Sequence, residues 1–600
     1  MVKGSQIMFL EQKKVKRTGR VYLSIKQGYR DKDGKTKSKT IKALGYLDEL
    51  SKKMDYPIAH FEAEAKRLEL EANSESSITV TIKSDEHIMP GDTDSRKSYG
   101  YIVLSQIYHE LELDRFFNNK RRHENFEYNS ESIMRLLSYA RIIYPESKRQ
   151  TLQLKDRFFE GFDFSLDDVY DSLEHFEKIA QDAQLHIHEK VTAQYGRDAS
   201  LIYYDVTNYY FETEKQDDMR KDGYSKEHRR DPIIQMGMAI DRNGLPMAYR
   251  TYPGNTHDSE TYIPSLTQIK KEYNVGRAVV VADKGLNCGD NIVFSSALKD
   301  GYIFSQSVTG GCADLKEFVL NEKGYTVPTQ DGFKMKSRIT PVTVKISNGV
   351  TKSGKKSRKT ITLEAQKQIV FYSPKYAERT RYKRSIALQK AADLVKDPAK
   401  YSRATHYGAA AYVNNFEIDK KTGKYTETDK ELSINKAKVA EEEKYDGYYA
   451  IITSEADTPD GDIIDMYHGL WRIEETFKIT KSVLRTRPVF VYKKEHIGGH
   501  FLVCFIALML LRLVEKRLGG EFSAECIADT LREVECSHMS ENAYLFSYAD
   551  NVTEAVREKM GIDLTRKCMT LREIKQRIGA TKKRDGKQTL CPGVAGPPSA

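Results

Sequence analysis

The order of strand and helix patterns between residues 201 and 307 constrains the fold of this chain more than any other feature. Leu201 to Tyr204 is a short apolar run that ends at Asp205, as a buried strand does. Two further strand patterns flank Asp241-Arg-Asn-Gly244, whose residues are typical of a hairpin turn. The sequence therefore predicts three consecutive antiparallel strands.

A helix pattern and a second buried strand follow the hairpin. Residues 259–273 have helical character, and Ala278 to Ala282 is a strongly β-prone run that ends at Asp283. Three antiparallel strands followed by alternating helices and strands are the chain order of an α/β, ribonuclease-H-like catalytic core, in which a parallel strand lies beside the first hairpin strand. We therefore expect Asp205 and Asp283 at the ends of neighbouring central strands.

A third carboxylate lies on a helix pattern later in the chain. Apolar residues between Ile463 and Leu484 recur at spacings of three, four and seven, which defines one face of a helix. Tyr467, Glu474 and Lys481 are each seven residues apart, so one continuous helix would align them beside the buried stripe. A carboxylate held there can be directed at the edge of the predicted sheet.

Positive charge is concentrated in two stretches of the chain. The net charge is +10, yet residues 1–50 hold 13 Lys and Arg against 5 Asp and Glu, and residues 351–400 hold 14 against 4. Two separate basic surfaces suit a polyanion such as a nucleic acid. Ordinary solvated lysines are the alternative interpretation of either stretch.

Cysteine spacing and hydropathy exclude several other classes of protein. The 7 cysteines include no CxxC or Cys/His pattern, so neither a zinc site nor a disulfide framework is indicated. Residues 1–20 contain no apolar segment typical of a secretory signal. The most apolar run, Phe501 to Leu511, is about half the roughly 20 residues that a membrane-spanning helix needs. We interpret that run as a buried helix and expect a cytoplasmic protein.

Changes in pattern divide the chain into six predicted regions. A Ser-rich break at Asn73 to Ser77 predicts a linker, and Gly- and Lys-rich turns interrupt the α/β pattern after about residue 310. The predicted regions are a basic β-hairpin unit for DNA binding (1–75), a helical DNA-end-binding domain (76–195), the first part of the core (196–309), an inserted basic β-rich domain (310–444), the Glu474 helix of the core (445–485), and a C-terminal helical region with a disordered tail (486–600).

Four motifs, in this order, resemble those of a known family. They are Tyr204-Asp-Val-Thr-Asn-Tyr-Tyr-Phe-Glu212, Pro253-Gly-Asn-Thr256, Val281-Ala-Asp-Lys-Gly285, and Tyr467-His-Gly-Leu-Trp-Arg-Ile-Glu-Glu475 followed by Lys481. The set resembles the DDE transposases of the insertion-sequence 4 (IS4) type, and within it the IS1634/IS1549-like group with a long insertion before the Glu helix. The resemblance extends from about residue 95 to 515.

The resemblance implies a metal-dependent DNA transposase. It gives Asp205, Asp283 and Glu474 the catalytic and metal-binding roles, with Asp205 bridging two Mg²⁺ ions, for which Mn²⁺ can substitute. This chemistry suits three acids, because hard cations prefer carboxylate oxygens, and two metals about 3.5 to 4 Å apart serve both the attacking and the leaving oxygen. Tyr467 and Lys481 are implied to hold phosphates of the DNA end.

One position departs from the pattern of this family. The signature of the Glu helix is Tyr, x2, Arg, x3, Glu, x6, Lys, and the Arg position is Leu470 here. Arg472 lies two positions on and would face differently, so Arg485 and Arg487 are further candidates for the missing charge. The resemblance also implies that the basic insertion grips the DNA backbone, and the candidate contacts there are Lys355, Lys356, Arg358 and Lys359.

The expected function is therefore DNA transposition by a prokaryotic, nucleoid-associated enzyme. Its expected partner is double-stranded DNA, both terminal inverted repeats and target, with a homodimer in the synaptic complex and no membrane. Two alternatives stay open: a nuclease on the same core that cuts without joining, and a non-catalytic DNA-binding relic. Trp471, the one Trp, is expected in the core, with stacking on a flipped base as the alternative.

Overall fold

The computed structural model describes residues 7–583 except 16–17, 31–35, 75–86, 88–95, 123, 224–230, 351–355, 419–424, 428 and 540–541. The predicted tail Pro592 to Ala600 and most of the predicted linker therefore lie outside the described residues. The described residues divide into two compact units. One comprises those within 1–97, 536–547 and 566–575, and the other comprises the remainder.

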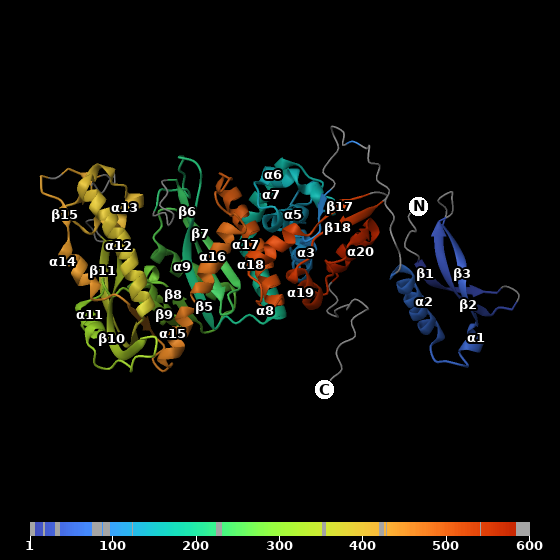
Figure 1. Ribbon diagram of the computed structural model, residues 1–600, viewed down its shortest axis with the longest axis horizontal. Coiled ribbons are helices and arrows are strands. Elements are labelled where there is room, and N and C mark those ends of the chain that lie inside the picture. Colours follow the sequence, from blue (N-terminus) through green and yellow to red (C-terminus); the bar gives the residue numbers. More distant parts are fainter. Residues whose placement is uncertain are drawn as a thin grey trace. The chain divides into compact units, whose positions relative to one another are not determined.

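The N-terminal segment forms a three-stranded antiparallel sheet with a helix packed on one face (Figure 1). Leu23 and Ile25 of the middle strand are fully buried, and Phe61 and Ala65 are buried at helical spacing on the helix that covers them. The elements are β1 (Ile7–Lys14), β2 (Val21–Arg30), β3 (Thr36–Tyr46), α1 (Leu47–Leu50) and α2 (Pro57–Ser74).

A second, four-stranded sheet joins segments far apart in the chain. Its strand order is β19 (Cys568–Thr570), β18 (Ala543–Phe546), β17 (Glu535–His538) and β4 (Arg96–Ser98). The periodicity of the C-terminal region predicts helices throughout, but the region also contains these short strands. Sequence periodicity cannot show this sheet, because its strands are three or four residues long and one comes from the other end of the chain.

Helices dominate residues 101–195 and pack around one long apolar helix, α17 (Lys494–Arg517). By length and composition alone α17 could cross a membrane, but 94% of its most apolar window is buried inside the protein. The prediction of a buried helix at Phe501 to Leu511 is confirmed. The other helices are α3 (Tyr101–Glu110), α4 (Leu113–Arg121), α5 (Ser130–Ile143), α6 (Lys148–Gln153), η1 (Lys155–Arg157), α7 (Leu166–Lys178), α8 (Ala180–Tyr195), α18 (Ala524–Glu533), α19 (Asn551–Met560) and α20 (Leu571–Thr581).

An eight-stranded sheet with helices on both faces makes this part of the chain mixed α/β. β5 (Leu201–Tyr210), β6 (Ile233–Asp241) and β7 (Pro246–Pro253) are antiparallel neighbours, as the hairpin signal predicts. Asp241 Oδ1 accepts hydrogen bonds from the backbone N–H groups of Asn243 and Leu245, which stabilises the turn. β8 (Val279–Ala282) and β9 (Gly301–Gln306) then run parallel to β5, in the order β5-β8-β9.

Alternation along the strands assigns their side chains to two faces of the sheet. Tyr204, Val206, Val280 and Ala282 belong to a core that includes residues of α9 (Asp258–Glu272) and α10 (Gly289–Ala297). The Tyr204 hydroxyl donates to Thr261 Oγ1 of α9 at 2.9 Å. The residues between these positions therefore point to the opposite face.

The inserted region adds two long strands to the central sheet and also forms two small two-stranded sheets, β12-β15 and β13-β14. Strand β11 (Lys356–Tyr372) pairs with β10 (Lys334–Val350) on one side and with β16 (Tyr448–Thr453) on the other. Ile369, Val370 and Ile451 at this junction are fully buried, which drives the pairing. The remaining elements of the inserted region are α11 (Ala313–Leu320), α12 (Pro374–Lys396), η3 (Pro398–Lys400), α13 (Arg403–Ala410), β12 (Val413–Asn414), β13 (Glu417–Ile418), β14 (Tyr425–Thr426), β15 (Ser433–Ile434) and α14 (Lys436–Glu443).

Candidate active site

The parallel pairing of two central strands brings the first two candidate acids level. Leu201 pairs with Val279, and the register continues through Tyr203 and Val281. Two residues further along are Asp205, in the middle of β5, and Asp283, directly after β8, so the two acids lie side by side and, by alternation, on the face opposite α9. Asp205 is therefore not at a strand end, contrary to the prediction, because β5 continues to Tyr210 beside β6. A 3-10 turn, η2 (Lys284–Leu286), begins directly after Asp283 and ends the strand there.

The helix predicted over 463–484 is two helices, which corrects the expected alignment. α15 (Asp460–His468) carries Tyr467, and α16 (Trp471–Ser482) carries Glu474 and Lys481. Between them the Leu470 N–H donates to the Tyr467 carbonyl and the Arg472 N–H to the Gly469 carbonyl, hydrogen bonds three residues apart that tighten the chain. Tyr467 therefore does not lie in one straight row with the other two.

A close approach to β5 explains the glycine at the junction of these helices. A Cβ atom on Gly469 would lie 1.9 Å from the Tyr203 hydroxyl oxygen, so only glycine allows the chain to pass here. Further along, the Tyr209 hydroxyl and Thr480 Oγ1 are hydrogen-bonded at 2.9 Å, which fixes α16 against β5. Tyr203 and Tyr209 alternate onto the same face as Asp205, so α16 covers the face of the candidate acids.

Hydrogen bonds orient the second acid and the tyrosines near it. The Ser305 hydroxyl, at the end of β9, donates to Asp283 Oδ1 at 2.9 Å. The hydroxyls of Tyr449 and Tyr467 are hydrogen-bonded to each other. Burial raises the pKa of Tyr467 and that of Tyr449, and the charge of Asp283 raises both further. Both phenols thus stay protonated and can serve as hydrogen-bond donors.

Glu474 approaches the same group of residues from α16. Besides burial and the charge of Asp283, the Glu474 charge also raises the pKa of Tyr449, so both carboxylates lie near this ring. Glu474 is exposed in the first turn of the helix and has no hydrogen bond or ion pair with any described residue. Its carboxylate is not committed to another partner.

The donor chemistry of this face suits a hard divalent cation. Asp205, Asp283 and Glu474 together offer only carboxylate oxygens, the ligands that such ions prefer. In the described part of the chain, however, no three His, Cys, Asp or Glu side chains are gathered closely enough to hold a metal ion. The three acids therefore share a face in an open arrangement, and metal binding requires them to converge.

The remaining predicted DNA contacts differ in their positions. Arg472 Nη1 donates to the Tyr203 hydroxyl at 3.4 Å, so its guanidinium is turned to β5. Leu470 is buried, Lys481 is half-buried, and Arg485 is exposed on the loop after α16. The Arg487 guanidinium lies 5.8 Å from the centre of the Tyr210 ring.

The basic residues predicted on the insertion lie away from the acids along a long strand. Arg358 and Lys359 are exposed in the outer half of β11, which pairs with β16 only from Lys367 onward. At the rise of an extended strand, Arg358 is roughly 30 Å from Lys367. Lys355 lies outside the described residues, and so does the side chain of Lys356.

Trp471 is not a core residue, contrary to the prediction. Its side chain is 55% exposed, while Ile473 and Phe477 fill the buried stripe of α16. The tightened junction before α16 turns Leu470 inward and Trp471 outward. The Arg472 guanidinium lies 5.4 Å from the centre of the Trp471 ring.

Three residues of this site were missed by the sequence analysis. Ser305 follows a predicted strand and could have been found by the same strand-end reasoning that selected the acids. Tyr449 and Tyr376 gave no local signal. The Tyr376 ring, on α12 of the insertion, meets the Tyr449 ring edge-on at 5.2 Å, and burial, Tyr449 and Asp283 raise its pKa.

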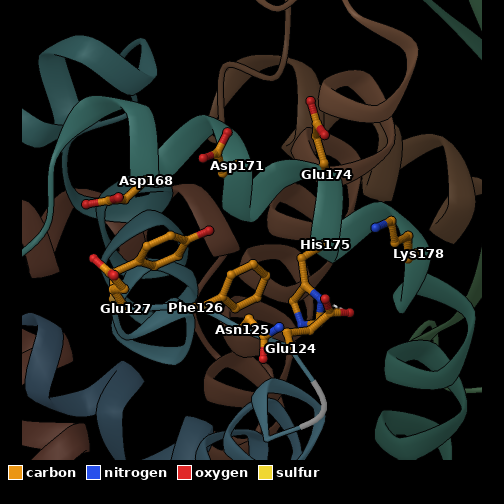
Figure 2. Close-up of a pocket in the computed structure, with 10 residues that line it drawn as sticks. Glu124, Asn125, Phe126, Glu127, Asp168, Asp171, Glu174, His175 and Lys178 are labelled. Atoms are coloured by element: carbon orange, nitrogen blue, oxygen red, sulfur yellow. Dashed lines mark ion pairs between the residues drawn. The ribbon is translucent and has the colours of Figure 1, made fainter.

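A separate cavity of about 400 Å³ in the helical region is strongly acidic (Figure 2). Figure 2 shows the α7 residues Asp168, Asp171 and Glu174 along one helix, with Phe126 and His175 below them. Glu124 and Glu127 add two more carboxyl groups to the lining, against the single cation Lys178. This surface repels a phosphate backbone.

Comparison with known proteins identifies the family. Residues 196–510 match the family described as "Transposase DDE domain", which is more than half of the chain, and the chain therefore belongs to the DDE transposases. Residues 10–78 match "IS1634 family transposase, N-terminal domain". The protein is thus an IS1634-family DNA transposase, a metal-dependent enzyme of DNA cleavage and transfer.

Two solved structures share a weaker likeness with the chain. One is a piggyBac transposase synaptic complex with hairpin DNA, with 9% identity and a TM-score of 0.31 over 79% of this chain and 88% of that one. The other is a Mos1 transposase paired-end complex with the left transposon end, with 10% identity and a TM-score of 0.13 over 41% and 73%. At such scores neither likeness bears on this chain. No curated protein matches it.

Proposed function

We propose that this transposase cleaves and joins DNA at Asp205, Asp283 and Glu474, in a ribonuclease-H-like core, with Mg²⁺ as the metal and Mn²⁺ as a substitute. The observation that supports the proposal is the register of β5 and β8, which brings Asp205 and Asp283 side by side on one face of the sheet. α16 then supplies Glu474 on the same face.

The residues around the acids have distinct tasks in this proposal. When bound, the metal ions activate the attacking hydroxyl and stabilise the leaving oxygen. Ser305 keeps one oxygen of Asp283 oriented, which leaves the other for the metal. Of the two hydrogen-bonded hydroxyls of Tyr449 and Tyr467, the one that accepts from the other donates its own proton to a phosphate oxygen of the DNA end. Lys481 adds a compact positive charge to the same strand.

DNA is held in the proposal by basic surfaces on several elements. The N-terminal sheet recognises the terminal inverted repeats, and exposed Arg358 and Lys359 contact backbone farther from the cut. Exposed Trp471 stacks on a base displaced from the duplex. Two ends must meet before strand transfer, so the working form is a homodimer on DNA, acting in the cytoplasm.

The test is cleavage of a DNA fragment that carries the ends of the protein's own element. Wild-type protein with Mg²⁺ should nick at defined ends and then form joined products. Asp205→Asn, Asp283→Asn and Glu474→Gln should each abolish both steps. The matched control is Glu475→Gln, which removes the neighbouring charge on the same helix and should retain activity.

Each alternative has its own outcome in this assay. Cuts at undefined positions without joined products would favour a nuclease on the same core. Binding of the ends without cleavage in either Mg²⁺ or Mn²⁺ would favour a non-catalytic relic, with Leu470 as the first position to examine. If Glu475→Gln loses as much activity as the three variants, the loss cannot be assigned specifically to Asp205, Asp283 and Glu474.

A further inference from the structure

Three basic side chains are buried together behind the loop that leaves α16. Lys148 is 4% exposed, His500 is 4% exposed and Arg141 is 6% exposed. Lys148 Nζ lies 3.0 Å from His500 Nδ1, and His500 Nε2 lies 3.3 Å from the Thr486 carbonyl oxygen. A carbonyl only accepts, so Nε2 carries the imidazole proton and Nδ1 accepts from Lys148.

Among the described residues, no carboxylate contributes to the pKa shift of Lys148 or of His500. The groups that shift the pKa of Lys148 are burial, Arg141 and Cys504, and those that shift His500 are burial, Lys148, Arg141 and the Thr486 backbone. Neither set contains an Asp or a Glu. Arg141 itself forms no hydrogen bond or ion pair in the described part of the chain.

Two donors in the cluster are buried without a partner. They are Arg141 Nε and the Thr486 hydroxyl, both enclosed and both without a hydrogen bond among the described residues. A guanidinium stays charged at any ordinary pH, so Arg141 cannot avoid the free-energy cost of burying its charge by losing a proton. Leaving such a charge unpaired is costly, and folded proteins satisfy buried polar groups with a partner, a water or an ion.

A group with several acceptor oxygens and negative charge would satisfy all of these donors. Arg141, Lys148 and Thr486 offer a guanidinium, an ammonium and a hydroxyl, the donor set with which proteins bind a tetrahedral oxyanion. We propose that Arg141, Lys148 and Thr486 form a phosphate-binding site, separate from the face of Asp205, Asp283 and Glu474.

The position of the site connects it with the DNA. Thr486 belongs to the loop between α16 and α17, five residues after Lys481. The outer side of this loop carries three exposed side chains, Arg485, Phe490 and Tyr492. The segment beside the site therefore presents a positive charge and two aromatic rings to solvent. The phosphate is either one of the DNA backbone, which rests on the proposed function, or free phosphate.

The first arm measures phosphate binding without DNA or metal. Thermal unfolding of the full chain is followed as inorganic phosphate replaces chloride at constant ionic strength. Wild-type protein should be stabilised progressively, and Lys148→Met and Arg141→Met should each bind phosphate about 10-fold more weakly or worse, the loss expected for one charged hydrogen bond. Lys271→Met, which removes an exposed charge on α9, is the matched control and should respond as wild type.

The second arm identifies the source of the phosphate. Affinity for a duplex carrying the element's ends is measured against salt for the same proteins. If a DNA phosphate occupies the site, Lys148→Met should reduce the magnitude of the slope of log affinity on log salt by about 0.9, the value for one phosphate. An unchanged slope with a positive first arm assigns the site to free phosphate.

The results that would overturn the proposal are equally definite. If wild type, Lys148→Met and Lys271→Met respond identically to phosphate and share one salt slope, the cluster binds no phosphate. Lys148→Met removes a buried charge and should fold even if Arg141→Met does not, so this comparison is always available. Because the first arm needs no cleavage, failure of the catalytic proposal would not affect it.

Discussion

Replacing Lys148 by methionine should stabilise the anion-free protein, and by an amount that depends on pH. Burial and the nearby Arg141 lower the pKa of Lys148 from its ordinary 10.5 to about 7. The unfolded chain therefore binds a proton between pH 7 and pH 10.5 that the folded chain does not hold. This makes Lys148 destabilising at pH 7, and the penalty fades as the pH rises toward 10.5.

The magnitude follows from the two pKa values of Lys148. At 1.36 kcal/mol per unit, the penalty is about 4 kcal/mol at pH 7 and about 1 kcal/mol at pH 9.5. Methionine keeps the length of the side chain but loses the hydrogen bond to His500, which costs about 1 kcal/mol. Lys148→Met should therefore gain about 3 kcal/mol at pH 7 and almost nothing at pH 9.5.

Denaturant unfolding of wild type and variant at the two pH values measures this difference directly. Phosphate and sulfate are left out, because a bound anion would favour the charged lysine and reduce the gain. Lys271→Met should show no difference between the two pH values. The reasoning is refuted if Lys148→Met is less stable than wild type at pH 7, or if its advantage is the same at pH 7 and pH 9.5.

Three other changes test the catalytic face. Ser305→Ala removes the hydrogen bond to Asp283 and should slow single-turnover nicking about 10-fold without loss of DNA binding; an unchanged rate would remove Ser305 from the site. Gly469→Ala places a methyl group against Tyr203 and should cost about 1 to 3 kcal/mol in denaturant unfolding, whereas Gly461→Ala, which meets nothing within 4 Å, should be neutral. Chelation of divalent ions should abolish nicking and leave binding of the ends intact; nicking that survives chelation would contradict a metal-dependent site.

Local sequence signals were sufficient for the central strands and for the positions of two acids. An apolar run ending in Asp205, a turn at Asp241 to Gly244 and a β-prone run ending in Asp283 each depend on neighbouring residues only. The register of β5 and β8 then follows from their parallel pairing. The strands, the turn and the end of β8 are predictable because each signal lies within about ten residues. The continuation of β5 past Asp205 to Tyr210 depends instead on its pairing with β6.

Features that depend on distant contacts were not predictable in the same way. Position 469 requires glycine because Tyr203, far away in the chain, occupies the space a side chain would need. Periodicity alone predicts one helix, and the size of Trp471 alone predicts a buried side chain, whereas the side chain is exposed. Lys148 gives no sign in the sequence of its burial against His500, because the two lie 352 residues apart.

The shared sheet also limits how this transposase can be shortened. β11 of the insertion covers one side of β16, and β9 covers the other. Excision of residues 310–444 would leave β16 with a free row of N–H and C=O groups along a strand that contains Ile451 and Ile452. Exposed apolar edges of this kind recruit other chains. A protein truncated in this way would therefore self-associate through β16. Any shortened version must retain β11 or replace it with another strand.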